Sequence, residues 1–256
     1  MTRLVLLILA ALLGAFSLAA ADEVPKAEAV LDRYLEVTGG KAAYEKVHSE
    51  VTKGTMEVAG RGIKGALQSF QAEPYLDYTV VDLEGIGKVE SGSDGDVFWE
   101  RSAVTGPRIK DGEEREEISR ASLFNPHLNW RKMYDKTEMA GVETVDGEEC
   151  VKIVLTPKAG SSVTELYSKK TGLLMKQSSV HKTPMGDIPA EAFLKDYKQV
   201  SGITMPFTRV NKFAGQEIQI HLDSIEFNTE IAKDRFNLPE EIKALVRKNG
   251  ATNEKK

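Results

Sequence analysis

The side chains best suited to chemistry are four histidines and a single cysteine. No two histidines stand at a metal-binding spacing such as H-E-x-x-H, because they are scattered along the chain at His48, His127, His181 and His221. The chain also lacks a G-x-S-x-G nucleophile elbow, a phosphate-binding loop and a dinucleotide fingerprint. The sequence therefore predicts no catalytic residue, no metal site and no cofactor, and it favours a function other than catalysis.

Two acidic segments offer alternatives to this conclusion. Asp94-Gly95-Asp96 could begin a calcium loop, but the spaced oxygen ligands and the distal Glu of such a loop are missing, so a hairpin turn is favoured. A second acidic group could hint at a metal: Glu113, Glu114, Glu116 and Glu117. Because Arg115 and Arg120 interleave with it, we interpret this group as the solvated face of a helix.

The N-terminus has the order of charge, apolar run and small residues that marks a secretory signal peptide. Arg3 precedes the apolar run from Leu4 to Leu18, and Ala19-Ala20-Ala21 ends at a cleavage point before Asp22. The alternative is a membrane anchor, but a spanning helix needs about 20 apolar residues and this run is shorter. We expect residues 1–21 to be cleaved and the mature chain to be periplasmic or outside the cell.

Composition narrows the class of protein further. The formal net charge of −5 argues against nucleic acid as a partner, because nucleic-acid binding needs a basic footprint. Cys150 is the only cysteine, so no internal disulfide can form and stability must come from burial. An isolated cysteine on an apolar strand is typical of a small core residue.

Helical patterns occupy the start of the mature chain. From Val24 to Val37, apolar residues recur at the spacing of one helix face, and Gly39-Gly40 provides the left-handed residues that end a helix. Lys41 to Val47 suggests a second short helix. Ile242, Leu245 and Val246 indicate a brief helix near the C-terminus, followed by a polar tail over residues 247–256 that is expected to fray.

From Glu50 onward, the pattern changes to short segments with alternating apolar and polar residues. Three of them show the alternation plainly: Leu76 to Val80, Val151 to Leu155, and Ile218 to Leu222. Closely spaced turn signals such as Asp146-Gly147 predict hairpins, and therefore an antiparallel meander of roughly ten strands. A parallel sheet would need longer crossovers. The fold class predicted is mainly β, with added helices.

The segment from Asp111 to Tyr134 has no alternation and interrupts the meander. Asn125-Pro126 divides it, since the residue before a proline is disfavoured in helix, and two short inserted helices are predicted. Aromatic residues crowd this segment, which raises two interpretations of the interior. The first is an ordinary packed core. The second is a curved sheet that is only partly filled, with the helices closing a cavity for an apolar ligand.

The cavity interpretation predicts a set of lining residues, chosen from strand alternation and from the supposed position of the helices: Leu76, Tyr78, Val80, Trp99, Phe124, Leu128, Trp130, Ile218, Ile220 and Leu222. The choice of strand face is the sensitive step, because a shift of one residue exchanges the two faces.

Several segments, taken in order, resemble the LolA/LolB-like group of periplasmic lipoprotein and lipid carriers. They are Ala72 to Tyr78, Ser93 to Trp99, Leu166 to Lys176, Asp196 to Phe207 and Phe236 to Pro239. The resemblance covers most of the mature chain, residues 22–246. It implies an incomplete, strongly curved antiparallel β-barrel with helices over its concave side. It also implies a non-catalytic carrier that takes up lipid or the acyl chains of a lipoprotein for transfer toward the outer membrane.

One residue departs from this resemblance. Carriers that hand on lipoproteins resemble each other in a basic residue just before the proline that matches Pro74, whereas this chain has Glu73. The cargo, the membrane donor and the acceptor proteins are therefore left open, and a monomer is expected. Two other classes stay as alternatives: an enzyme, and an envelope binding or scaffold module with a solid core and a protein partner.

Overall fold

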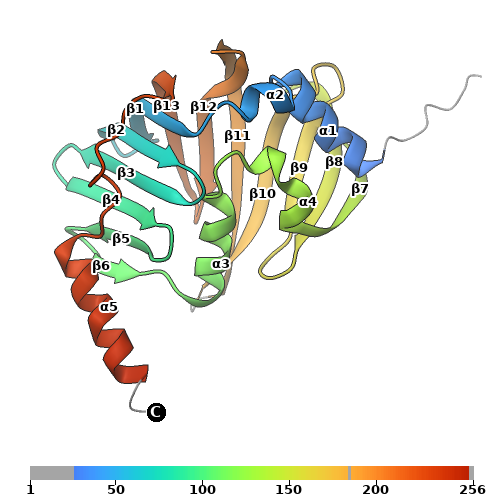
Figure 1. The fold of residues 1–256 in the computed structure, drawn as a ribbon. Coiled ribbons are helices and arrows are strands. Elements are labelled where there is room, and N and C mark those ends of the chain that lie inside the picture. Colours follow the sequence, from blue (N-terminus) through green and yellow to red (C-terminus); the bar gives the residue numbers. More distant parts are fainter. Residues whose placement is uncertain (1–25, 184–185, 254–256) are drawn as a thin grey trace, which may run out of the picture.

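The computed structural model describes residues 26–183 and 186–253, so the predicted signal peptide over residues 1–21 lies outside the described residues. The described chain forms one antiparallel sheet of thirteen strands, which is curved and not closed (Figure 1). The strands are β1 (Ser49–Val58), β2 (Ile63–Ala72), β3 (Leu76–Leu83), β4 (Gly87–Asp94), β5 (Phe98–Ser102), β6 (Gly106–Ile109), β7 (Tyr134–Val145), β8 (Glu148–Pro157), β9 (Val163–Ser168), β10 (Leu174–Thr183), β11 (Gly186–Val200), β12 (Ile203–Phe213) and β13 (Gln216–Phe227).

The strand order is that of a meander joined at one point. Strands that follow one another from β1 to β6 and from β7 to β13 are neighbours, and β1 pairs with β13 to join the two runs. The edge strands are β6 and β7. The predicted incomplete antiparallel barrel is therefore confirmed. The estimate of about ten strands was too low, because β5 and β6 are short and show no apolar alternation.

Helices cover the concave side of the sheet (Figure 1). They are α1 (Ala27–Val37), α2 (Lys41–Tyr44), α3 (Gly112–Ala121), the 3-10 helix η1 (Pro126–Leu128) and α4 (Trp130–Met133). The chain from β6 to β7 passes through α3, η1 and α4, so the insertion predicted between Asp111 and Tyr134 joins the two edges of the sheet. We call residues 112–133 the lid segment. As predicted, α1 ends at two glycines, and Gly40 donates to the carbonyl of Leu35 at 2.8 Å.

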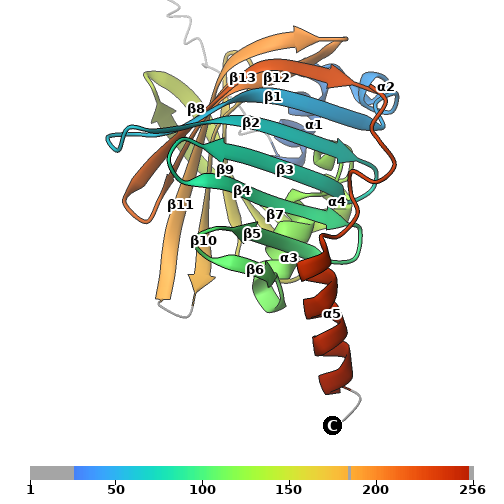
Figure 2. The same cartoon turned by 90° about the vertical axis from the view of Figure 1, so that its left-hand side faces the viewer.

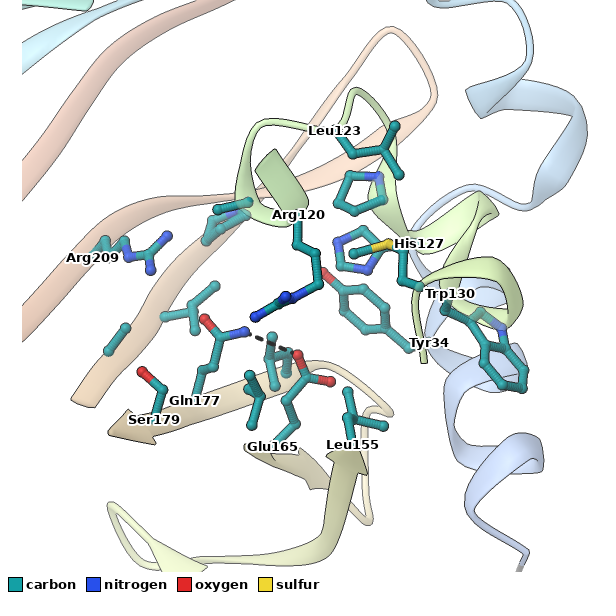
Figure 3. Close-up of a pocket in the computed structure, with 18 of the residues that line it drawn as sticks. Tyr34, Arg120, Leu123, His127, Trp130, Leu155, Glu165, Gln177, Ser179 and Arg209 are labelled. Atoms are coloured by element: carbon teal, nitrogen blue, oxygen red, sulfur yellow. Dashed lines mark hydrogen bonds between the residues drawn. The ribbon is translucent and has the colours of Figure 1, made fainter. Parts of the chain in front are cut away.

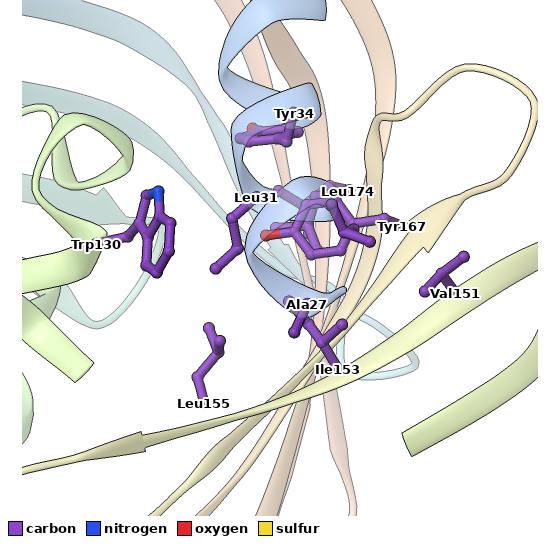
Figure 4. Close-up of a cluster of buried hydrophobic side chains, with 11 residues drawn as sticks. Ala27, Leu31, Tyr34, Trp130, Val151, Ile153, Leu155, Tyr167 and Leu174 are labelled. Carbon is purple, nitrogen blue, oxygen red and sulfur yellow. The ribbon is translucent and has the colours of Figure 1, made fainter. Parts of the chain in front are cut away.

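The main core lies between α1, α4 and strands β8 to β11. Figure 4 labels most of its eleven buried residues, which are Ala27, Val30, Leu31, Tyr34, Trp130, Val151, Ile153, Leu155, Tyr167, Leu174 and Leu194. The apolar face of α1 predicted from its spacing is thus the face that packs on the sheet. Cys150 is fully buried, as expected for a small core residue.

The C-terminal segment lies on the other face of the sheet. After β13 the chain passes the ends of the N-terminal strands to reach α5 (Glu240–Asn253), which contacts β6 (Figure 2). On the way, the guanidinium of Arg235 lies over the rings of Phe70 and Tyr78, at 4.4 and 5.4 Å from their centroids. The helix α5 is longer than the brief helix predicted and continues through Asn253.

Candidate functional site

A cavity of about 650 Å³ lies between the concave face of the sheet and the helices that cover it (Figure 3). Most of the lining side chains come from α1, the lid segment and strands β8 to β13, and α2, β1, β2 and β7 contribute one residue each. Its volume falls within the range of roughly 300–1,000 Å³ that is typical of small-molecule sites in proteins. The cavity is therefore large enough for a ligand and is walled mostly by the carboxyl-terminal half of the sheet.

Much of the wall is apolar. The larger apolar side chains at the cavity are Leu31, Leu123, Phe124, Trp130, Met133, Leu155, Val163, Leu174, Leu194, Ile203, Met205, Phe213 and Phe227. Several of them also belong to the main core, so the cavity is continuous with the packed interior. Its surface can bury aliphatic groups, each methylene contributing about 0.8 kcal/mol.

A polar row crosses the floor of this cavity. The strand register places Glu165 beside Gln177, Gln177 beside Ala192, and Ala192 beside Asn211, on neighbouring strands from β9 to β12. The amide of Gln177 donates to Glu165 Oε1 at 3.1 Å, and the hydroxyl of Tyr167 donates to the other carboxyl oxygen at 2.5 Å. Burial raises the pKa of the Glu165 carboxyl, against the effect of both hydrogen bonds. The low dielectric of the cavity therefore favours a protonated carboxyl at this position.

Arg209 lies two residues before Asn211 in β12 and points into the cavity (Figure 3). Its Nε donates to Asn211 Oδ1 at 2.9 Å, and its cross-strand partners are Leu194 and Ile220. Desolvation lowers the pKa of Arg209 although the side chain is exposed. This combination of exposure and partial desolvation is expected for a side chain on the wall of a hollow.

Two further titratable groups face the cavity. Burial lowers the pKa of His127 in η1 to about 4, and burial raises the pKa of Glu50 in β1 to about 7. The ring of His127 packs edge-on against Tyr34 and Tyr44, with centroids 4.7 and 6.5 Å apart. Desolvation is the cause of both pKa shifts, and neither group contributes to the shift of the other.

The lid segment is attached to the amino-terminal helices by polar contacts. Asn125, in the left-handed conformation with φ of 49°, donates from its side-chain amide to the carbonyls of Tyr44 and Val47 at 3.2 and 3.0 Å. Arg131 forms an ion pair with Asp32 of α1 at 2.7 Å and stacks over the Trp130 ring at 4.0 Å. Exposed ion pairs of this kind contribute about 1 kcal/mol or less. The ion pair is therefore a weak part of this attachment, and Trp130, which is buried in the main core with α1, is the stronger part.

The ten residues predicted to line a cavity are placed in three groups. Phe124 and Trp130 line it, and Leu128 packs in the neighbouring cluster around Phe124 and Ile203. Ile218 and Ile220 pair with Asn211 and Arg209 and so share the cavity face, and Leu222 pairs with Gly54 further along β13; these three are not among the lining residues.

The remaining four lie on the opposite face of the sheet: Leu76, Tyr78, Val80 and Trp99. Gln71 lines the cavity and pairs with Asp77, so the alternate residues of β3 point away from it. Trp99 pairs with Gly92, which pairs with Tyr78, and the rings of Tyr78 and Trp99 lie 6.3 Å apart. The structure thus separates Trp99 from Trp130 by the thickness of the sheet.

The charged groups of the cavity were not predicted from the sequence. Glu165 lies two residues from the buried Tyr167 in β9, and Arg209 lies two residues from the buried Phe207 in β12. Residues two apart in a strand share a face, so these buried aromatic residues were the signal that could have found the two charged ones. A charged residue within such a face is uncommon unless it is paired or functional.

The described residues also bear on metal sites and membrane spans. Over residues 26–183 and 186–253, no group of three or more His, Cys, Asp or Glu side chains is placed to hold a metal ion. Asp94 is the last residue of β4, and its carboxylate accepts from the amides of Asp96 and Val97 in the following connection at 3.1 and 2.9 Å. No helix in the described part of the chain combines the length and the apolar character needed to cross a membrane.

Comparisons with known proteins give matches among solved structures only. No family model matches the sequence, and no curated protein matches it. A DUF1329 family protein from Desulfovibrio piger aligns over 83% of this chain and 97% of its own, with a TM-score of 0.58 and 14% identity. A domain assigned to outer membrane lipoprotein sorting, from Vibrio parahaemolyticus, covers 84% of this chain and 98% of its own, with a TM-score of 0.56 and 14% identity.

A LolA superfamily protein from Nitrosomonas europaea is similar to the same extent. It covers 84% of this chain and 98% of its own, with a TM-score of 0.54 and 11% identity. These alignments span nearly the whole described chain. The resemblance to LolA-like proteins inferred from the sequence is therefore confirmed for the fold, a curved open sheet with helices on its concave side.

Proposed function

We propose that this chain is a non-catalytic carrier that binds a lipid, or the acyl chains of a lipoprotein, in the cavity between sheet and helices. The observation that carries the proposal is a hollow of about 650 Å³, walled by large apolar side chains and covered by short helices. Because each buried methylene contributes about 0.8 kcal/mol, an aliphatic chain can be held there without any reactive group.

The lid segment supplies a route for loading. The ion pair between Arg131 and Asp32 is exposed on both sides, and Asn125 supplies two hydrogen bonds on the other side of η1. Movement of such a segment would admit a chain and close over it, as lids do in many binding proteins. The similar fold of a domain assigned to lipoprotein sorting supports the same class of cargo.

A carrier without catalysis fits the titratable groups of the cavity. The pKa shifts of His127 and Glu50 have burial as their cause, and Glu165 bonds to Tyr167 and Gln177. In an acid–base pair, each group is expected to contribute to the pKa shift of the other. None of these three groups contributes to the pKa shift of another. Incubation with phospholipid or lipoprotein and analysis for hydrolysis products tests this part of the proposal, which predicts that no product forms.

The proposed setting is the periplasm, with transfer toward the outer membrane. It is motivated by the signal-peptide pattern of residues 1–21. Glu73, at the position where lipoprotein carriers resemble each other in a basic residue, has its carboxylate 3.0 Å from His48 Nδ1. Fractionation of cells that express the full chain, with sequencing of the mature N-terminus, tests export and cleavage before Asp22.

The direct experiment is mass spectrometry of lipid extracted from protein purified out of the periplasm. We expect lipid to copurify in about a one-to-one ratio, and the delipidated protein to take up an added fatty acid. If the purified chain carries no lipid and takes none up, an envelope scaffold with a protein partner replaces the carrier.

A further inference from the structure

Seven charged residues line the cavity, and the surroundings of Arg209 point to a ligand. The acidic residues at its wall are Glu50, Glu117, Glu165 and Glu191, and the basic ones are Arg120, Arg209 and Lys212. Glu191 is paired with Lys176 at 2.6 Å, and Lys212 with Glu217 at 3.8 Å. Among the described residues, Arg209 has no carboxylate within the 4.0 Å of an ion pair. Its bond to the neutral amide of Asn211 leaves the ends of the guanidinium to the hollow.

The nearby groups do not neutralise Arg209. The phenol of Tyr197 is the group that interacts with it electrostatically, and this hydroxyl donates to the carbonyl of Leu174 at 2.7 Å. Glu50 is too far from Arg209 to pair with it. Their partners on β13 are Phe227 and Ile220, which are seven residues apart. At the rise of a β-strand, seven residues span roughly 20 Å. The buried carboxyl of Glu165 is biased toward its neutral form.

The exposed guanidinium of Arg209 faces the hollow between its cross-strand partners Leu194 and Ile220, neither of which can pair with its charge. A ligand with a negative charge would supply the missing partner. Arg presents a planar fork that fits a carboxylate or a phosphate with two parallel hydrogen bonds. Arg120 reaches from α3 into the same space and adds positive charge (Figure 3).

We infer that the cavity takes an amphiphile with an anionic head group, a carboxylate or a phosphate monoester, and that Arg209 binds this group. The inference rests on the proposed function, whose ligand class it narrows. The aliphatic part of the ligand lies against Leu155, Leu174 and Trp130, and the head group reaches Arg209 and the amide of Asn211. A neutral amphiphile of equal length gains the apolar contacts only.

The test compares matched ligands on the full mature chain. Palmitate, palmitoyl lysophosphatidate and hexadecanol each displace the neutral fluorescent probe N-phenylnaphthylamine, on wild type and on Arg209→Gln, Arg209→Lys and Arg61→Gln. Arg61 lies in an exposed turn and is the control. We expect wild type to bind at least one anionic ligand about tenfold to a hundredfold more tightly than hexadecanol. The Arg209→Gln variant should lose this preference with hexadecanol unchanged, Arg209→Lys should keep part of it, and Arg61→Gln should keep all of it.

The outcomes separate the two proposals. The anionic ligand that loses more affinity in Arg209→Gln identifies the head group as carboxylate or phosphate. Equal affinities for all three ligands, in wild type and in Arg209→Gln alike, overturn the head-group assignment and leave the carrier intact. Failure of the probe and of all three ligands to bind wild type overturns the carrier itself. Thermal melting of each variant checks that a lost preference is not a lost fold.

Discussion

The imidazole of His127 lies edge-on against the ring of Tyr34, with the two ring centroids 4.7 Å apart and an interplanar angle of 71°. This contact joins the lid segment to α1 directly over the cavity. Because the imidazole is desolvated there, its neutral form is the one that the folded protein accommodates. If the lid segment opens as proposed, acid should favour opening at this contact.

The first prediction follows from this histidine. Its pKa falls from an ordinary 6.5 to about 4 on folding, so the unfolded chain binds more protons than the native one between these values. The contribution of His127 to the free energy of unfolding should therefore be fully present above about pH 6.5. It should be lost as the pH falls toward 4, which lowers the free energy of unfolding by up to about 3 kcal/mol. A His127→Phe variant keeps an aromatic contact and should lose this part of the pH dependence. Urea unfolding of both proteins across the range measures it, and identical pH profiles would contradict the assignment.

Glu50 should behave in the opposite sense. Burial raises the pKa of its carboxyl from 4.5 to about 7, so the native protein binds more protons than the unfolded chain within that window. Stability is lost as the pH rises through it. Glu50→Gln should match wild type below about pH 4 and exceed it above about pH 7, by up to about 3 kcal/mol. Urea unfolding at the two ends of the range is the measurement, and a variant less stable than wild type at high pH would refute this.

Filling the cavity should block uptake and leave the fold intact. Ala190 in β11 pairs with Ser179 and Phe213, and all three line the cavity. An Ala190→Trp variant places an indole in the hollow and should reduce fatty-acid binding at least tenfold, since about two buried methylenes account for that factor. Ala140→Trp, at an exposed position of β7, is the matched control. Equal binding by the two variants would place the ligand elsewhere.

The ion pair between Asp32 and Arg131 should control the rate of exchange more than the stability. The two side chains are 43% and 62% exposed, so the pair contributes about 1 kcal/mol or less. Asp32→Asn removes the pair and keeps the stacking of Arg131 on Trp130. We expect lipid release up to about fivefold faster, with melting nearly unchanged. Lys136→Gln breaks a comparable pair with Glu138 within β7 and should leave the rate unchanged. An unaltered release rate in Asp32→Asn would show that this contact does not hold the lid.

Local sequence patterns were enough to predict the elements of this fold. The apolar spacing of α1, the glycines after it, the hairpin turns and the helical interruption between β6 and β7 are each set by neighbours in sequence. The pairing of β1 with β13 was not predicted, because it joins residues such as Glu50 and Phe227 that no turn connects.

The strand face was harder to predict than the strand. In β3 the side chains on both faces are at least partly covered, because Arg235 of the C-terminal segment lies over Tyr78 while Val81 is buried on the cavity face. Alternation then gives no preference for one face, and Tyr78 was predicted to line the cavity. In the lid segment the prediction placed Phe124 and Trp130 at the cavity, because that helical insertion has a single sheet face to cover.

The most direct test uses the two tryptophans as reporters on opposite faces of the sheet. Trp130 lines the cavity, and Trp99 packs beside Tyr78 on the other side. The single-tryptophan variants Trp99→Phe and Trp130→Phe are titrated with a fatty acid brominated along its chain, which quenches an indole on contact. If the cavity is the lipid site, fluorescence of Trp130 is quenched saturably in Trp99→Phe, while that of Trp99 is unchanged in Trp130→Phe. Quenching of Trp99 alone, or no saturable quenching of Trp130, would contradict the carrier.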